Sequence, residues 1–125
     1  MTPPRKKRQT ALERAARIGT RAAAVGFDWP DSEGPKQKVI EELQELAEAE
    51  RGMDKERVIE ELGDLLFAVV NLARHLGADP EQALAGANAK FQRRFRLMDE
   101  AIRADGLTLG ELAVEALEDY WQSVK

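Results

Sequence analysis

Residues 38–46 read K-V-I-E-E-L-Q-E-L, and residues 57–65 repeat nearly the same pattern as R-V-I-E-E-L-G-D-L. In both stretches the apolar residues recur at helical spacing, so each stretch predicts an amphipathic helix. Each also carries acids three residues apart, which places them on one face of a helix. The repeat therefore predicts two helices that hold their carboxylates at the same angle to their apolar faces.

The segment between the two stretches predicts a tight connection. Residues 50–54 read E-R-G-M-D, which indicates a helix end, a turn and a new helix capped by Asp54. In an antiparallel hairpin about residue 53, four carboxylates from the two helices would converge on one patch. Carboxylates held together at a packed surface are costly to desolvate unless a cation joins them, and oxygen-only clusters suit Mg²⁺ or Mn²⁺. The alternative is ordinary surface glutamate on repetitive helices. The acids concerned are Glu41, Glu42 and Glu45 in the first stretch and Glu61 and Asp64 in the second.

The rest of the pattern predicts an all-α fold. We expect a helical bundle of about five helices and no strand, with capping boxes at residues 10–13 and 108–111 opening the first and last helices. The third helix is apolar all round at residues 65–70, and Phe67 lies away from its main apolar stripe. One layer of helices would leave Phe67 in water. We therefore expect oligomerisation to complete the bundle, as a homodimer or a dimer of dimers.

Composition bounds the class of protein. The chain has 125 residues, 43% hydrophobic and 34% charged, which fits one soluble domain over residues 10–125 after a disordered basic tail at residues 1–9. No apolar run is long enough for a membrane span, and no apolar segment typical of a signal peptide follows the basic start. Cysteine is absent, which excludes disulfides and favours a cytoplasmic protein. Four clustered charges without interleaved aromatic residues make nucleic-acid binding unlikely.

Several motifs together resemble one family, the all-α nucleotide pyrophosphohydrolases of the MazG type. The motifs are E-E-x-x-E, then E-x-x-D after 15 residues, together with G-F-D-W-P at 26–30, N-L-A-R-H-L-G at 71–77, A-N-A-K-F-Q-R-R-F at 87–95 and W-Q-S-V-K at 121–125. The resemblance covers roughly residues 14–125 and is to the catalytic C-terminal half of two-domain MazG proteins. The N-terminal half of that two-domain form has no counterpart here.

This resemblance implies hydrolysis of a nucleoside triphosphate to the monophosphate and pyrophosphate with Mg²⁺, a reaction of nucleotide-pool cleaning. It also implies metal ligands at Glu42, Glu45, Glu61 and Asp64, with Glu41 as a further ligand or as the group that orients water. Phosphates would meet Lys90 and Arg94, and the nucleotide would meet Trp121 and Lys125.

Other readings remain open at this stage. Lys38 is as well explained by an ion pair with Glu42 as by phosphate binding, and Asn71 by capping an acid as by binding a ligand. Two other functions keep the same residues. One is a superfamily relative of narrow specificity, such as a phosphoribosyl-ATP or dUTP/dCTP hydrolase. The other is a helical module that binds a nucleotide or a partner without catalysis.

Overall fold

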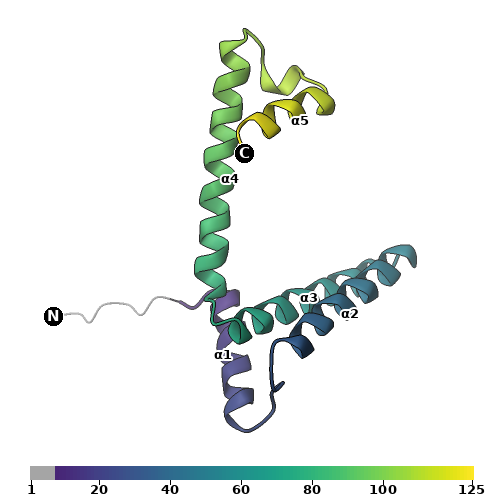
Figure 1. Ribbon diagram of the computed structural model, residues 1–125. Helices are drawn as coiled ribbons and strands as arrows, with labels where there is room; N and C mark the ends of the chain where they lie inside the picture. Colours follow the sequence, from purple (N-terminus) through teal and green to yellow (C-terminus); the bar gives the residue numbers. More distant parts are fainter. Residues whose placement is uncertain (1–7) are drawn as a thin grey trace, which may run out of the picture. The chain divides into compact units, whose positions relative to one another are not determined.

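The computed structural model describes residues 8–125 (Figure 1). Within this part all regular secondary structure is helical, with no strand, so the predicted all-α class of about five helices is confirmed. None of these helices combines the length and apolarity needed to cross a membrane. The elements are α1 (Ala11–Ala24), α2 (Glu33–Arg51), α3 (Lys55–His75), α4 (Pro80–Ala104), the 3₁₀ turn η1 (Leu109–Glu111) and α5 (Val114–Ser123).

Contacts within the chain divide it into two compact units. The first unit runs to Glu81 and holds α1, α2, α3 and the first two residues of α4, and the second runs from Gln82 to Lys125. The single domain expected over residues 10–125 stays a prediction, and most of the expected basic tail, residues 1–7, lies outside the described residues.

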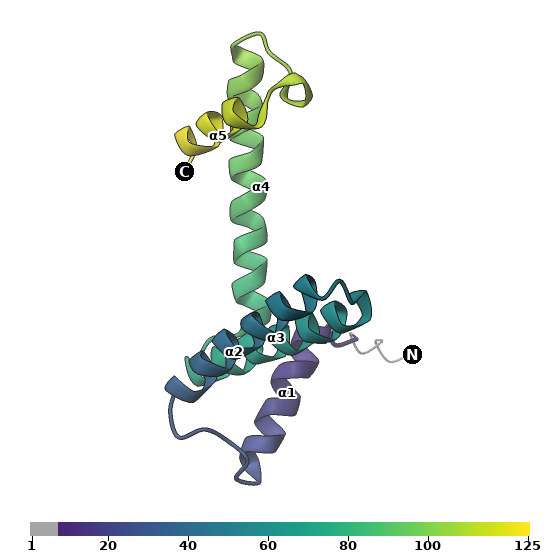
Figure 2. The same ribbon diagram turned by 90° about the vertical axis from the view of Figure 1, so that its right-hand side faces the viewer.

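The antiparallel hairpin of α2 and α3 is the centre of the first unit (Figures 1 and 2). Gly52 ends α2, and Met53 takes a positive φ of 55°, which turns the chain back on itself. The Asp54 side chain then accepts a hydrogen bond of 3.2 Å from the Arg57 N–H and caps α3, as the sequence predicts. Ala49 and Ala68 are buried, and alanines let two helix backbones approach closely.

Helix α1 and its N-cap residue Thr10 contact Glu81 and the end of α3 within the first unit. The Thr10 hydroxyl accepts a hydrogen bond of 3.1 Å from the Glu13 N–H, which confirms the predicted cap, and donates one of 2.6 Å to Glu81. Gly19 of α1 faces the end of α3, where an added Cβ atom would lie 3.4 Å from the side chains of Asn71 and Arg74. Any larger residue at position 19 would press on that pair.

The loop between α1 and α2 is tied to the end of α3 through Asp28. Its carboxylate accepts hydrogen bonds from Arg74 Nη2 at 2.6 Å and from Arg74 Nη1 at 3.1 Å, and His75 Nε2 lies 2.7 Å away. Hydrogen bonding to the Arg74 guanidinium holds the pKa of Asp28 well below its usual range. His75 therefore hydrogen-bonds at the end of α3.

Much of the apolar surface of the hairpin remains exposed. Phe67 is 44% exposed, and the large apolar residues of α2 and α3 are similarly uncovered, although a soluble monomer rarely shows a wide apolar patch. These residues are Ile40, Leu43, Ile59, Leu62, Leu66 and Val69.

In the second unit α5 folds back along the C-terminal half of α4 (Figures 1 and 2). Met98 and Ile102 are buried, and the ring of Phe91 lies 5.3 Å from that of Trp121, centroid to centroid. The Tyr120 hydroxyl donates a hydrogen bond of 2.5 Å to Asp105.

One predicted boundary in the second unit is wrong. The capping box at residues 108–111 does not open the last helix, which begins at Val114. The Thr108 side chain makes no cap, and the Glu111 and Leu112 N–H groups bond the carbonyls three residues earlier. That pattern closes a single 3₁₀ turn, after which Leu112 is extended.

The ion pair of Asp28 predicts how stability responds to acid. Because the pKa of Asp28 is lowered by folding, its contribution is present above the unfolded-state value of about 3.9 and is lost as pH falls toward the folded-state value. Asp28→Asn should therefore melt at a lower temperature than the parent at pH 7. The gap should shrink below about pH 4, followed by circular dichroism melts. A gap that stays constant from pH 7 to pH 3 would contradict this assignment.

Candidate functional site

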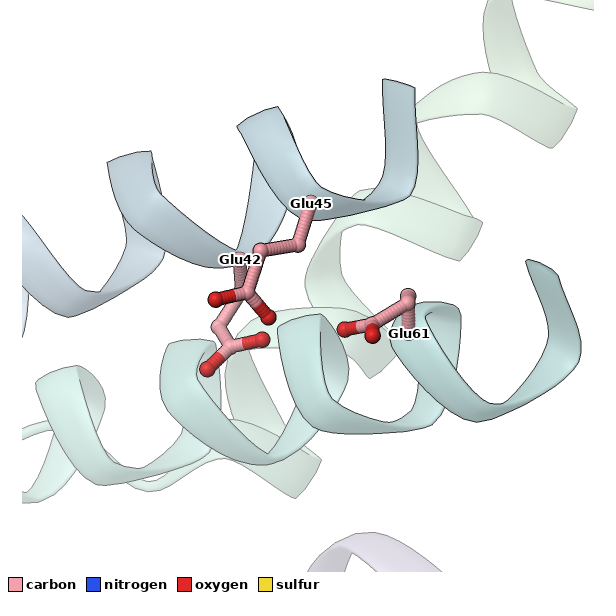
Figure 3. Close-up of side chains that lie close together, drawn as sticks. All are labelled: Glu42, Glu45 and Glu61. Carbon is pink, nitrogen blue, oxygen red and sulfur yellow. The ribbon is translucent and has the colours of Figure 1, made fainter. Parts of the chain in front are cut away.

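Three glutamates from the two helices of the hairpin meet at one point (Figure 3). Glu42 and Glu45 stand one turn apart on α2, and Glu61 faces them from α3. One carboxylate oxygen from each lies within 4.8 Å of the other two. We call these three residues the carboxylate cluster. The structure thus brings together three of the four acids that the sequence analysis nominated as metal ligands.

Two oxygens of the carboxylate cluster are buried without a partner. Glu42 is 5% exposed, and its Oε2 makes no hydrogen bond within residues 8–125. Glu61 Oε2 is likewise buried and unbonded among the described residues. A buried charged oxygen without a partner costs free energy, and a divalent cation coordinated by oxygen removes that cost. The donor set and the unpaired oxygens therefore fit a hard cation such as Mg²⁺ or Mn²⁺.

The pKa of Glu45 is raised by its two neighbours in the carboxylate cluster. Hydrogen bonding to Glu61, followed by the charge of Glu42, raises the pKa of Glu45 above its usual value. Ionising all three groups together is therefore unfavourable in the absence of a cation.

Two basic residues flank the cluster at equivalent positions of the repeat. Lys38 Nζ lies 3.1 Å from Glu42 Oε1, and Glu42, mainly by this hydrogen bond, raises the pKa of Lys38. Arg57 Nε lies 3.9 Å from Glu61 Oε1. The sequence analysis named Lys38 as a candidate site residue but did not name Arg57. The signal was present, because both basic residues stand four positions before a clustered glutamate.

The other two acids of the motif lie outside the carboxylate cluster. Asp64 is exposed and stands one turn after Glu61, in the place that the repeat makes equivalent to Glu45. Its side chain is one methylene shorter than that of glutamate, which shortens its reach across the hairpin. Glu41 is exposed, and its Oε2 lies 3.7 Å from Lys38 Nζ.

Two hollows open in the first unit near these residues. The larger, of about 480 Å³, is mainly apolar and includes Phe27, Trp29 and Phe67 in its lining. The smaller, of about 350 Å³, is lined by Trp29 together with Lys38 and Glu41, and so adjoins the carboxylate cluster through Lys38.

Asn71 belongs to the network at the end of α3. Its Oδ1 accepts hydrogen bonds from Arg74 Nη2 at 2.8 Å and Arg74 Nε at 3.2 Å, and Asn71 also lines the larger hollow. Asn71 thus orients the Arg74 guanidinium, which in turn binds Asp28. The spacing of these residues in the sequence did not predict this network.

The remaining nominated residues lie in the second unit. Lys90 is exposed on α4, and Arg94, one turn later, has its Nε buried without a hydrogen-bond partner among the described residues. Trp121 is partly buried against Phe91, and Lys125 is exposed.

Comparison with known proteins agrees with this geometry. Residues 32–96, which contain the whole carboxylate cluster, match the model of the MazG nucleotide pyrophosphohydrolase domain. The chain belongs to the MazG family. The predicted resemblance is thereby confirmed, and the matched range also includes Lys90 and Arg94.

Named members of the MazG family are similar over nearly the whole chain. The chain is 51% identical over 115 residues to a Thermotoga maritima protein named nucleoside triphosphate pyrophosphohydrolase/pyrophosphatase MazG. It is 48% identical over 117 residues to the Escherichia coli K12 nucleoside triphosphate pyrophosphohydrolase. Each alignment covers 92% of this chain and 44% of the relative, so the chain spans less than half the length of these curated relatives.

Substituting Glu45 tests the cluster as a metal centre. Glu45→Gln removes one of three repelling charges, so the variant should melt at a higher temperature than the parent in chelator. Adding Mg²⁺ should raise the parent's melting temperature, because the ion binds only the folded state, and should raise that of the variant much less. Calorimetric melts with and without Mg²⁺ make the measurement. An equal rise in both proteins would remove Glu45 from the ligand set.

Proposed function

We propose that this chain is a metal-dependent nucleoside triphosphate pyrophosphohydrolase that converts an NTP or dNTP to the monophosphate and pyrophosphate. The observation that carries the proposal is the pair of buried, unpartnered oxygens on Glu42 and Glu61, within a hairpin that matches the MazG family. The names of the two relatives support the same activity for the full-length proteins. We propose that it extends to the part that this chain shares with them.

In this proposal Glu42, Glu45 and Glu61 hold the cation, Mg²⁺ or in its place Mn²⁺. When bound there, the ion supplies neutralisation of phosphate charge and acidifies water. Asp64 lies one turn beyond Glu61 and would complete the ligand set through a water molecule or a change of side-chain rotamer. Family membership and the unpaired oxygens support a divalent ion of this kind.

The protein's own side chains supply the remaining steps. A water molecule must attack the α-phosphorus in line with the departing pyrophosphate. Glu41 is exposed beside the cluster and is the carboxylate we assign to orient this water and accept its proton. Lys38, already paired with Glu42, is placed to balance the charge of an arriving phosphate. The chain has no cysteine for a covalent route, which favours direct attack by water.

Substrate contacts outside the first unit are proposed from the resemblance. Lys90 and Arg94 would bind phosphates, and Trp121 and Lys125 would contact the nucleotide. The buried, unpartnered Nε of Arg94 supports a role in binding an anion, because arginine buried without a partner is costly. A cytoplasmic place in nucleotide-pool cleaning, with no nucleic acid or membrane as partner, remains our expectation.

We further propose that the chain works as a homo-oligomer built on the α2–α3 hairpin. The exposed apolar residues of these helices support this, since a second copy of the same face would bury them. Either a dimer or a dimer of dimers would bury this apolar face.

The central experiment measures pyrophosphate release. A panel of NTPs and dNTPs should yield pyrophosphate and monophosphate with Mg²⁺ and none in excess chelator. Glu42→Gln and Glu61→Gln should each lower kcat by about 100-fold or more while the fold survives, because each removes a charge that holds the ion. A panel cleaved at a single base would favour the narrow-specificity relative.

The matched control is Glu60→Gln, the same chemical change one residue from Glu61 on an exposed position. Its rate should equal that of the parent. Full turnover in chelator would refute the metal assignment, and binding of nucleotide without any pyrophosphate release would favour a non-catalytic module.

Substitution at Phe67 tests the assembly. Phe67→Asp places a charge in the apolar face and should dissociate the oligomer, since an unpaired buried charge costs about 3–5 kcal/mol. Light scattering at matched concentration measures the mass, with Val114→Asp, 76% exposed at the start of α5, as the control that should stay assembled. A parent that runs as a 14.0 kDa monomer would end the proposal.

A further inference from the structure

A continuous chain of contacts runs from the end of α3 to the carboxylate cluster, and it passes through the loop before α2. Gly19 and Asn71 pack against Arg74, and Arg74 holds the Asp28 carboxylate with two hydrogen bonds, of 2.6 and 3.1 Å. Asp28 Oδ1 in turn accepts a hydrogen bond of 2.8 Å from the Trp29 N–H. The backbone of Trp29 is therefore held to α3 through Asp28.

The indole ring of Trp29 is fixed from its other side by Gly34. A Cβ atom at position 34 would lie 2.5 Å from two atoms of the ring, so only glycine leaves room for it. Gly34 lies in the first turn of α2, and the ring seated there lines the smaller hollow together with Lys38 and Glu41. Lys38 then reaches Glu42 of the carboxylate cluster at 3.1 Å.

We propose that Asp28, Arg74 and Gly34 are positioning residues that hold the Trp29 ring as a fixed wall of the hollow beside the carboxylate cluster. By holding it they set how tightly substrate is bound there, without touching the reacting atoms. This inference depends on the proposed function for its kinetic part. The positioning of the ring is a separate statement about the free protein.

The arginine is suited to this role because of its geometry. A planar guanidinium offers two parallel N–H groups to one carboxylate, whereas lysine offers a point charge that leaves the carboxylate free to pivot. His75 Nε2 lies 2.7 Å from Asp28 Oδ1 and is a further α3 group in contact with this carboxylate. Asp28 is thus held by two residues of α3 and holds the loop in one place.

The experiment compares three variants that break the chain at different links: Asp28→Asn, Arg74→Lys and Gly34→Ala. The control is Asp31→Asn, the same change in the same loop, at a carboxylate that accepts a local hydrogen bond of 2.9 Å from the Glu33 N–H. Fluorescence is read in a Trp121→Phe background, where Trp29 is the single tryptophan. Kinetics are read with Trp121 intact.

We expect all three variants to show stronger acrylamide quenching of Trp29 than the parent, and the control to match the parent. We also expect KM for the triphosphate to rise about tenfold, with kcat changed less than about threefold, because the lost interaction is one of binding. The rise in melting temperature on adding Mg²⁺ should equal the parent's, since the cluster is untouched. A merely structural role would not produce this separation of KM from kcat.

Other outcomes overturn the inference. Unchanged quenching in Asp28→Asn and Arg74→Lys would show that the Asp28–Arg74 pair does not position Trp29. A fall in kcat at constant KM would show an effect on the chemical step instead. If Asp28→Asn fails to fold, Arg74→Lys and Gly34→Ala decide the matter. If the parent cleaves no triphosphate, the proposed function fails, and the quenching data alone support or overturn the positioning of Trp29.

Discussion

The burial of Glu42 is the constraint on which this structure depends. One of its oxygens is paired with Lys38, the other is buried without a hydrogen-bond partner in the described part of the chain, and two further carboxylates lie close by. Without a cation, this arrangement destabilises the packing of α2 against α3, because that packing brings like charges together and removes them from water. The hairpin must then be held by contacts elsewhere, and Ala49 and Ala68 provide the close approach of the two backbones. A cation bound there would turn the same charges from a source of repulsion into a link between α2 and α3.

Sequence alone predicted the fold well where the signals were local. The Asp54 cap and the Gly52 stop fixed where the hairpin turns, and the repeat fixed which faces meet. Prediction failed where two local signals competed. Residues 108–111 have the composition of a capping box, yet a 3₁₀ turn satisfied the same N–H groups and delayed α5 to Val114. Propensity does not decide between two closures of similar energy.

The site was only partly predictable for reasons of reach and distance. The repeat treats Asp64 and Glu45 as equivalent, yet only the glutamate enters the cluster, since pattern matching ignores side-chain length. The Asp28 network joins residues 46 positions apart, and no periodicity connects them. Both motifs, G-F-D-W-P and N-L-A-R-H-L-G, were visible in the sequence, but that they complete one another is a property of three dimensions.

The hydrogen bond from Thr10 to Glu81 has a topological meaning. It joins the first helix to the last residue of the first unit, so the chain between them forms a loop whose ends meet. The chain entropy that is lost on closing this loop is therefore offset by contacts within the first unit itself. A module closed in this way can be joined to other sequences at its ends with little change to its interior. The carboxylates would then keep their relative positions whatever follows along the chain.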